Sequence, residues 1–200
     1  MADIKIAFPI IVSDNKGGGY EGVYSNDVND PAGLTIYGLE QTDDGDWSMW
    51  PTVKTIVKAG GTTAQITSKI VSNSSIYNSA LIYHKTKYWD PLGLDNIENQ
   101  LLANELYSIG LNIGLKNAGL YLQQVLNSLS LNGGYGLLTV DGNVGSKTIS
   151  AANANTNQSF LIHGLAWMHG SYYINLVTTK PSFKSFMNGW FNRVIGVTGF

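Results

Sequence analysis

The sequence predicts a mostly helical α+β protein with a small β element in its N-terminal part. Apolar residues recur at steps of three and four over most of the chain after Trp50, which is the spacing of amphipathic helices. The segment from 21 to 46 is instead rich in Asp, Asn, Gly and Pro, as loops and short hairpins are. The 200 residues contain no internal repeat or low-complexity tract, so we expect one compact unit.

The first predicted element is a short helix at residues 3–16. Pro9 lies inside it and removes one amide donor, and the glycines at 17–19 end it. In the loop-rich segment that follows, the stretch "LTIYGL" at residues 34–39 predicts a short hairpin.

Three helices are predicted between Trp50 and residue 95. Their apolar positions follow helical spacing, at Val53, Ile56, Val57, Ile66, Ile70, Ile76, Ala80, Leu81 and Tyr83. The stretch "YWDPLGLD" at residues 88–95 closes the third helix, because Pro91 disfavours helical backbone at Asp90.

The longest periodic segment runs from Ile97 to Leu129. Gly110, Gly114 and Gly119 lie inside it, and each costs about 1 kcal/mol relative to Ala in a helix. We therefore expect a helix break or a close packing contact at these glycines.

Residues 131–153 predict a turn, a short strand, an Asp141-Gly142 turn and a helix capped by Ser146. Two last helices are expected at about 156–177 and 182–194, with Pro181 near the start of the second.

The composition argues against several classes of protein. Twelve basic and 14 acidic residues give a net charge of −2, so no global field draws the chain to nucleic acid. The chain has no cysteine, which excludes disulfides, thiolate chemistry and Cys-ligated zinc. No apolar stretch approaches the roughly 18 residues of a membrane span, and the N-terminus lacks the pattern of a signal peptide.

Three familiar kinds of site are not supported by the sequence. The glycines of "GGGYEG" at residues 17–22 match a dinucleotide pattern, but no helix is predicted after them. His84, His163 and His169 have no spacing that pairs two on one helix face for a metal, so core or surface roles are expected. An elbow carrying a Ser nucleophile is also absent.

Glu21, Asp30 and Thr35 form the pattern E-x8-D-x4-T in the loop-rich segment. Glycoside hydrolysis needs a carboxylic acid to protonate the leaving oxygen and commonly a second carboxylate across the scissile bond. Tyr20, Tyr24 and Tyr37 could form a partly desolvated pocket that keeps the acid protonated. Taken alone, the same residues are more typical of a solvated or Asx-capped turn, because Asp- and Asn-rich loops usually have that role.

The stretch "EGVYSNDVNDPAGLTIYGL" at residues 21–39 resembles the opening motif of glycoside hydrolase family 108, a family of phage-type lysozymes. "ALIYHKTKYWDPL", "IGLNIGLKNAGLYLQQVLN", "VDGNVGSKTISAAN" and "FMNGWFNRV" resemble later segments of the same family, in order. The resemblance implies a lysozyme-like part at residues 1–95. It also implies a helical part at 96–200, resembling the family's peptidoglycan-binding region, with both packed as one compact unit.

The resemblance implies that Glu21 is the catalytic acid, Asp30 its partner and Thr35 a residue that orients the attacking water. It also implies a single-displacement, inverting mechanism with no cofactor and no metal. Aromatic and amide side chains are then candidates for sugar subsites, namely Tyr24, Asn26, Tyr37, Tyr88 and Trp89. For Trp89 a role in core packing is an equally good interpretation.

The function that the resemblance implies is an N-acetylmuramidase that hydrolyses bacterial peptidoglycan, in a phage endolysin or a virion-associated lysin. Lacking an export signal, it would reach the wall through a holin-type lesion, a virion tail or an injection apparatus. The alternative from another class is a non-catalytic wall-binding or virion structural protein with the same fold. An amidase or peptidase is disfavoured, because the chain has no Cys and no paired histidines.

Overall fold

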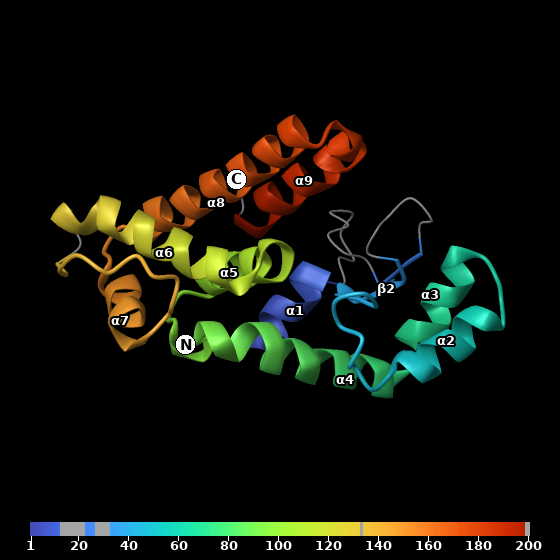
Figure 1. Cartoon of the computed structure of the whole chain (residues 1–200). Coiled ribbons are helices and arrows are strands. Elements are labelled where there is room, and N and C mark those ends of the chain that lie inside the picture. The colour runs from blue at the N-terminus through green and yellow to red at the C-terminus, as the bar shows by residue number, and fades with distance from the viewer. Residues whose placement is uncertain (13–22, 27–32, 133, 199–200) are drawn as a thin grey trace.

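The computed structural model describes residues 1–12, 23–26, 33–132 and 134–198. Helices dominate them and a three-stranded sheet lies in the N-terminal part, which confirms the predicted mostly helical α+β class. The α-helices are α1 (Ile4–Val12), α2 (Trp50–Lys58), α3 (Thr63–Val71), α4 (Ser74–His84), α5 (Gln100–Ile113), α6 (Leu115–Leu129), α7 (Ser146–Ala154), α8 (Gln158–Thr179) and α9 (Met187–Thr198). Figure 1 shows the antiparallel pair α8 and α9 along one edge, with α4 along the opposite edge.

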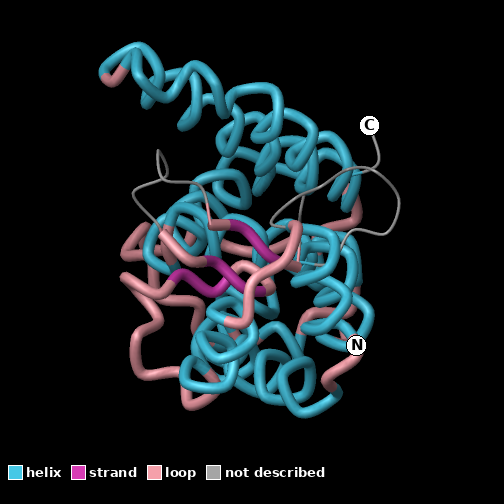
Figure 2. The backbone as a smooth tube through the Cα atoms, turned by 90° about the vertical axis from the view of Figure 1, so that its right-hand side faces the viewer, coloured by secondary structure: helices cyan, strands magenta, loops and turns pink. Residues whose placement is uncertain are grey.

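The sheet contains β1 (Tyr24–Ser25), β2 (Thr35–Ile36) and β3 (Leu39–Glu40) in antiparallel order β1-β2-β3. Figure 2 shows these short strands lying among helices. Ile36 pairs with Leu39, so the hairpin loop consists of Tyr37 and Gly38, and both have positive φ as a type I′ turn requires. The predicted hairpin at 34–39 is therefore confirmed.

Helix α1 forms despite Pro9, and its inner face buries Ala7, Phe8 and Ile11. The helix is described as far as Val12, so the predicted continuation to residue 16 falls outside the described residues. The packing of α1 against α4, α5 and α9 shows how an apolar face can outweigh a lost amide donor.

Helix α4 continues through a π-helical turn, η1 (Lys85–Trp89), into the 3₁₀ turns η2 (Asp90–Leu92) and η3 (Leu94–Asn96). The helical path ends at Gly93, inside the predicted closing segment, where φ is 61°. The prediction that Asp90 is non-helical is wrong, because Asp90 has φ −63° and ψ −41°. Pro91 occupies the first turn of η2, where no amide donor is needed, and so it does not end the helix earlier.

The glycines in the run 97–129 were predicted to cause a helix break or a close packing contact, and the structure shows one of each. Gly114, with φ 93°, separates α5 from α6. A β-carbon on Gly119 would lie 2.1 Å from the carbonyl oxygen of Gly142, so this glycine allows the loop to lie directly on α6. Helix α5 also packs against α1, α8 and α9, and so it connects the sheet side of the molecule to the last helices.

Between Gly134 and Gly145 the chain is irregular, and the predicted strand is not formed there. The physical reason is a side chain of α6: the Asn127 amide donates to the Leu138 carbonyl (2.8 Å) and accepts from the Leu138 amide (2.7 Å). Those backbone groups therefore need no partner strand. The predicted cap is also wrong, because Ser146 is the first residue of α7 and Gly145 holds the cap position.

The last two helices lie close to their predicted positions. The second begins with a 3₁₀ turn, η5 (Pro181–Phe186), before α9. Another short 3₁₀ turn, η4 (Ser130–Asn132), follows α6. No helix in the described ranges is long and apolar enough to cross a membrane.

Candidate active site

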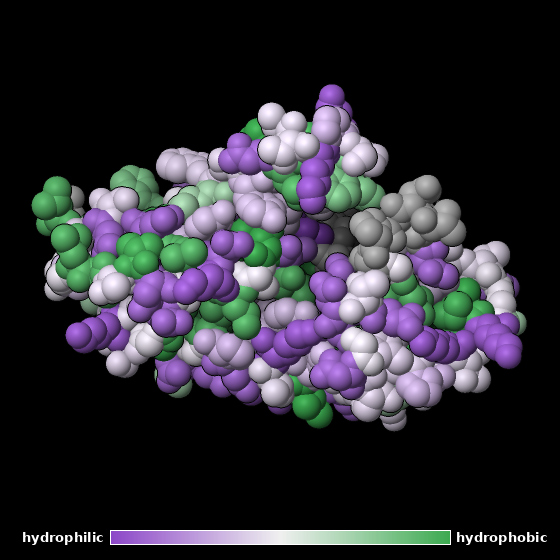
Figure 3. Space-filling model, viewed as in Figure 1, coloured by the Kyte–Doolittle hydropathy of each residue, from purple (hydrophilic) through white to green (hydrophobic). Residues whose placement is uncertain are grey.

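A cleft of about 730 Å³, here called the polar cleft, lies between the sheet side of the molecule and the junction of α5 with α6. It is lined by Thr42, Asp43, Lys87, Tyr88, residues 110–115 and Tyr172. Ligand pockets in proteins commonly have volumes of roughly 300–1,000 Å³, so the polar cleft can hold a ligand. The face in Figure 3 is hollowed near its middle, beneath the α8–α9 pair.

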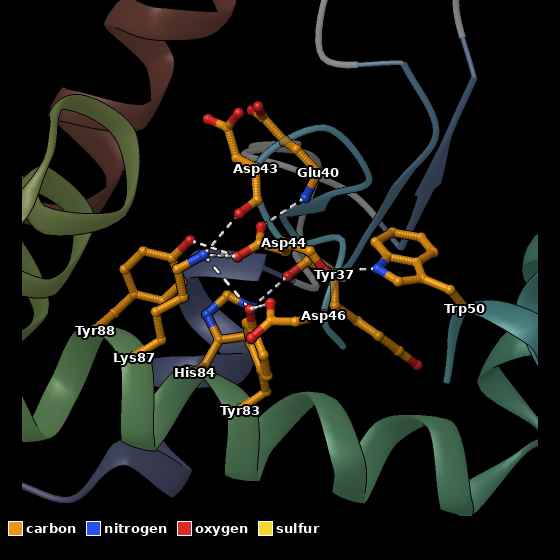
Figure 4. A network of polar contacts seen from close by, with 10 residues as sticks. All are labelled: Tyr37, Glu40, Asp43, Asp44, Asp46, Trp50, Tyr83, His84, Lys87 and Tyr88. Carbon is orange, nitrogen blue, oxygen red and sulfur yellow. Dashed lines mark hydrogen bonds and ion pairs between the residues drawn. The ribbon is translucent and has the colours of Figure 1, made fainter. Parts of the chain in front are cut away.

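The loop beside the cleft is held by Asp44, whose side chain is only 1% exposed. Its Oδ1 accepts from the Lys87 ammonium (2.6 Å) and from the Tyr88 hydroxyl (2.9 Å), and its Oδ2 accepts from the Glu40 amide (2.9 Å). The carbonyl of Asp44 accepts from the Trp50 indole (2.7 Å). Figure 4 shows these contacts converging on Asp44 from β3, α2 and the π-helical turn.

The π-helical turn supplies the two cleft residues that bind Asp44. Lys87 also donates to the Asp43 carbonyl (2.9 Å), which fixes the ammonium at the rim. Burial, with the Asp44 charge beside it, raises the pKa of Tyr88, so its hydroxyl stays protonated and donating. Single π-helical turns are frequent at functional sites, and this one directs Lys87 and Tyr88 toward the cleft side.

His84 lies fully buried behind this network. Its Nε2 is 2.9 Å from the Tyr37 carbonyl, which can only accept, so Nε2 carries a proton and donates. Its Nδ1 then accepts from the Tyr107 hydroxyl (2.7 Å). Burial lowers the pKa of His84 to about 4, consistent with a neutral ring. The bond to His84 and one from the Tyr37 amide to the Val23 carbonyl (3.1 Å) hold Tyr37 at φ 51°.

Of the three residues expected to perform the chemistry, Glu21 and Asp30 lie outside the described residues. Thr35 lies in β2, where it is buried and pairs with Ser25 and Glu40. Its hydroxyl donates to the Gly33 carbonyl over 3.4 Å, a long hydrogen bond. Its assignment as a water-orienting residue stays a prediction.

The expected sugar subsites fall into two groups. Tyr24 in β1 is half-buried, Asn26 is exposed and Tyr88 lines the polar cleft, so all three are accessible. Tyr37 and Trp89 are buried, and neither ring can offer its face to a sugar in this structure. Trp89 packs edge-on against Tyr107 and donates its indole proton to Asp95 (2.7 Å), which supports the packing interpretation.

The structure places all three histidines. His84 and His169 are core residues, as predicted, and His163 is half-buried. Across the described ranges, no group of three or more His, Cys, Asp or Glu side chains could hold a metal ion.

Comparisons with known proteins divide the chain in two. Residues 18–114 match the model of the family described as glycosyl hydrolase 108, and residues 117–195 match a model described as a predicted peptidoglycan domain. Residues 18–114 therefore belong to the glycosyl hydrolase 108 family. This membership and the second match support a lysozyme-like glycoside hydrolase that acts on peptidoglycan.

A solved structure described as that of Brucella abortus SagA has the same fold, with a TM-score of 0.61 and 17% identity over 98% of this chain and 91% of that one. A search of curated proteins found no match. The two matched regions meet between residues 114 and 117, at the break between α5 and α6. The division at residue 95 stays a prediction.

Sequence reasoning missed most of the cleft wall of this glycosyl hydrolase 108 protein. Asp43 and Lys87 in the wall, and Asp44 beside it, were not singled out, although the acidic run "TDDGD" at residues 42–46 was a usable signal. Tyr172 had no such signal, because only the packing of α8 against α5 and α6 brings it to the cleft.

Proposed function

We propose that the chain is an N-acetylmuramidase that hydrolyses the glycosidic bond between N-acetylmuramic acid and N-acetylglucosamine in bacterial peptidoglycan. The observation that carries the proposal is the polar cleft. Lys87 and Tyr88 line it from the glycosyl hydrolase 108 region, and Tyr172 lines it from the region that matches a peptidoglycan domain. A single polymeric substrate would contact both regions there.

In the proposed mechanism Glu21 is the acid and gives its proton to the bridging oxygen as the glycosidic bond breaks. Asp30 takes a proton from a water molecule that Thr35 orients, and the water oxygen bonds to the anomeric carbon. Both new ends are then hydroxyls, and the configuration at the anomeric carbon is inverted. Support comes from the sheet, because β1 begins three residues after Glu21 and pairs with the strand that contains Thr35.

The charges at the cleft suit an uncharged sugar chain. Among the described residues of its lining, Lys87 is the one basic residue, and its ammonium is paired with Asp44. Sugar hydroxyl and acetamido groups would therefore be bound by hydrogen bonds and by the Tyr88 and Tyr172 rings, with little long-range attraction.

The experiment uses purified sacculi and the full chain. The wild type should release muropeptides with new reducing N-acetylmuramic acid ends, identified by borohydride reduction and mass spectrometry. Glu21→Gln should lower the rate by about a thousandfold or more, since it removes the proton donor. Glu98→Gln, at an exposed position outside the cleft, is the matched control and should keep the wild-type rate.

Three outcomes would contradict the proposal. Equal release by wild type and Glu21→Gln excludes Glu21 as the acid, and cleavage in the stem peptide excludes a glycosidase. Sedimentation of the protein with sacculi without any release favours the non-catalytic wall-binding alternative. Proton NMR of the first-formed anomer tests inversion, for which the two carboxyl groups should be about 6.5–9.5 Å apart.

The proposal extends to a phage-type lysin that needs a separate route to the wall. When the chain is produced in a bacterial cytoplasm, lysis should require co-production of a holin-type pore. Lysis without the pore would show that the protein crosses the membrane by another route.

A further inference from the structure

A second hollow, here called the α6–α8 groove, has a volume of about 900 Å³. Helices α6 and α8 lie side by side in Figure 1 and form its two walls. Gly164 lets them approach closely, since a β-carbon there would lie 2.7 Å from a methyl group of Val125. In the part of the chain that the structure describes, four aromatic residues line the groove, namely Tyr121, Phe160, Trp167 and Tyr172.

Two of these rings are unusually exposed. Trp167 is 70% exposed and Phe160 is 61% exposed, although burying such a side chain would contribute a few kcal/mol to folding. Exposed aromatic residues gathered in one hollow mark a binding surface. Both lie in the region that matches a predicted peptidoglycan domain.

The other groove residues show which chemistry fits. None of the described residues that line the groove is charged, whereas uncharged polar groups line both walls: Gln124 and Ser128 on α6, and Ser171 and Asn175 on α8. A pyranose ring offers an apolar C–H face to an aromatic ring, and its hydroxyl and acetamido groups bond to amides and hydroxyls. The glycan of peptidoglycan has this character, because stem peptides convert the lactyl carboxylates of its sugars into amides.

The α6–α8 groove is adjacent to the polar cleft, because Tyr172 lines both. Helix α6 begins in the cleft at Leu115 and reaches the groove at Leu129, a rise of about 22 Å for its 15 residues. A small ligand could occupy one hollow, but only an extended polymer could occupy both.

We propose that the α6–α8 groove is a second binding site for the N-acetylated glycan strand, where the strand leaves the polar cleft. Trp167 and Phe160 stack on sugar rings, while Gln124 and Asn175 bind their polar groups. This inference rests on the proposed peptidoglycan substrate but not on the role of Glu21.

The test measures binding of an N-acetylglucosamine hexamer and dimer to the full chain carrying Glu21→Gln. Trp167 is far more exposed than Trp47, Trp50 and Trp89, so the hexamer should shift the tryptophan emission to the blue. Adding Trp167→Ala should abolish this shift and weaken hexamer binding about tenfold by calorimetry, the scale of one aromatic stacking contact. Dimer binding should change less, because a dimer cannot span both sites.

The matched control is Ile82→Ala, which removes a 66% exposed apolar side chain of α4 outside both hollows. It should bind the hexamer like the parent protein. Trp167→Phe keeps an aromatic ring and should retain most of the affinity, which separates loss of stacking from loss of folding.

Unchanged hexamer affinity in Trp167→Ala and Phe160→Ala would overturn the inference. So would a dimer of the protein that Trp167→Ala dissociates, since the groove would then bind a second copy of the chain. Hexamer binding and muropeptide release test the two proposals separately. If no Glu21-dependent release is found, hexamer binding at the groove is still expected. If the hexamer does not bind, Glu21-dependent release is still expected.

Discussion

Two fully buried histidines, one beside the cleft and one among the last helices, have very different surroundings. His84 lies between the Tyr37 carbonyl and the Tyr107 hydroxyl, both uncharged. His169 has its Nδ1 3.0 Å from the Glu105 carboxyl and its Nε2 3.0 Å from the Tyr173 hydroxyl.

The two regions differ in where their charged side chains lie and what these side chains contact. Near the cleft, the Asp44–Lys87 ion pair is at the rim and bonds to loop backbone, so it fixes a segment without regular structure. Among the helices, Glu105 of α5 is completely buried and meets His169 of α8, and Arg193 of α9 donates to the Tyr173 hydroxyl (2.9 Å). The first network shapes a site, and the second determines how three helices pack.

The largest expected change in stability comes from Asp44, which belongs to the network beside the cleft. Asp44→Ala removes a buried acceptor and leaves the Lys87 ammonium, the Tyr88 hydroxyl and the Glu40 amide without this partner. We expect the free energy of unfolding to fall by about 3–5 kcal/mol in urea denaturation. Asp43→Ala, whose carboxyl is exposed, should change it by less than about 0.5 kcal/mol. Similar losses in the two variants would refute the assigned role of Asp44.

The next effect uses pH and concerns His84. Burial lowers the pKa of His84 to about 4 from 6.5, so the unfolded chain binds more protons between these values. The full stability is present above pH 6.5, and about 3 kcal/mol should be lost as the pH falls through 4. Asp44 opposes this shift and Lys87 favours it, but burial is the largest cause. Urea denaturation of His84→Gln should show a flatter profile from pH 7 to 4, and an identical profile would contradict the explanation.

The smallest effect belongs to the helical network. Glu105→Gln keeps the shape of the side chain and one acceptor oxygen but removes the carboxylate beside His169. We expect a loss of about 1–2 kcal/mol by urea denaturation, since a hydrogen bond to a charged group becomes a neutral one. The exposed control Glu98→Gln should be nearly neutral. A gain in stability in Glu105→Gln would show that burying this carboxyl destabilises the fold.

The sequence predicted the structural features that depend on residues close together in the chain. The periodicity from Trp50 onward predicted the helices, and glycine placed the break at Gly114 and the close contact at Gly119. Errors arose where tertiary contacts replaced the local rule. Asn127 satisfies the backbone of Leu138 and prevents the strand expected there.

The candidate site was predicted unevenly for the same reason. The motif at 21–39 indicated a family and its chemistry, because its residues are adjacent in the chain. The described walls of the polar cleft come from four distant segments, and no pattern in the sequence joins Asp43 and Lys87 to Tyr172. Trp89 was ambiguous from sequence alone, and its complete burial supports packing.

The helix break at Gly114 also affects how such proteins can diversify. Gene recombination at this seam would join a foreign hydrolase half to residues 117–195, yet Gly114 and Tyr172 on either side line one cleft. Each exchange would therefore replace part of the substrate-contacting surface together with the module. The two halves of the chain must then co-evolve, and a chimaera joined at Gly114 would have a cleft with substrate-contacting residues from both parents.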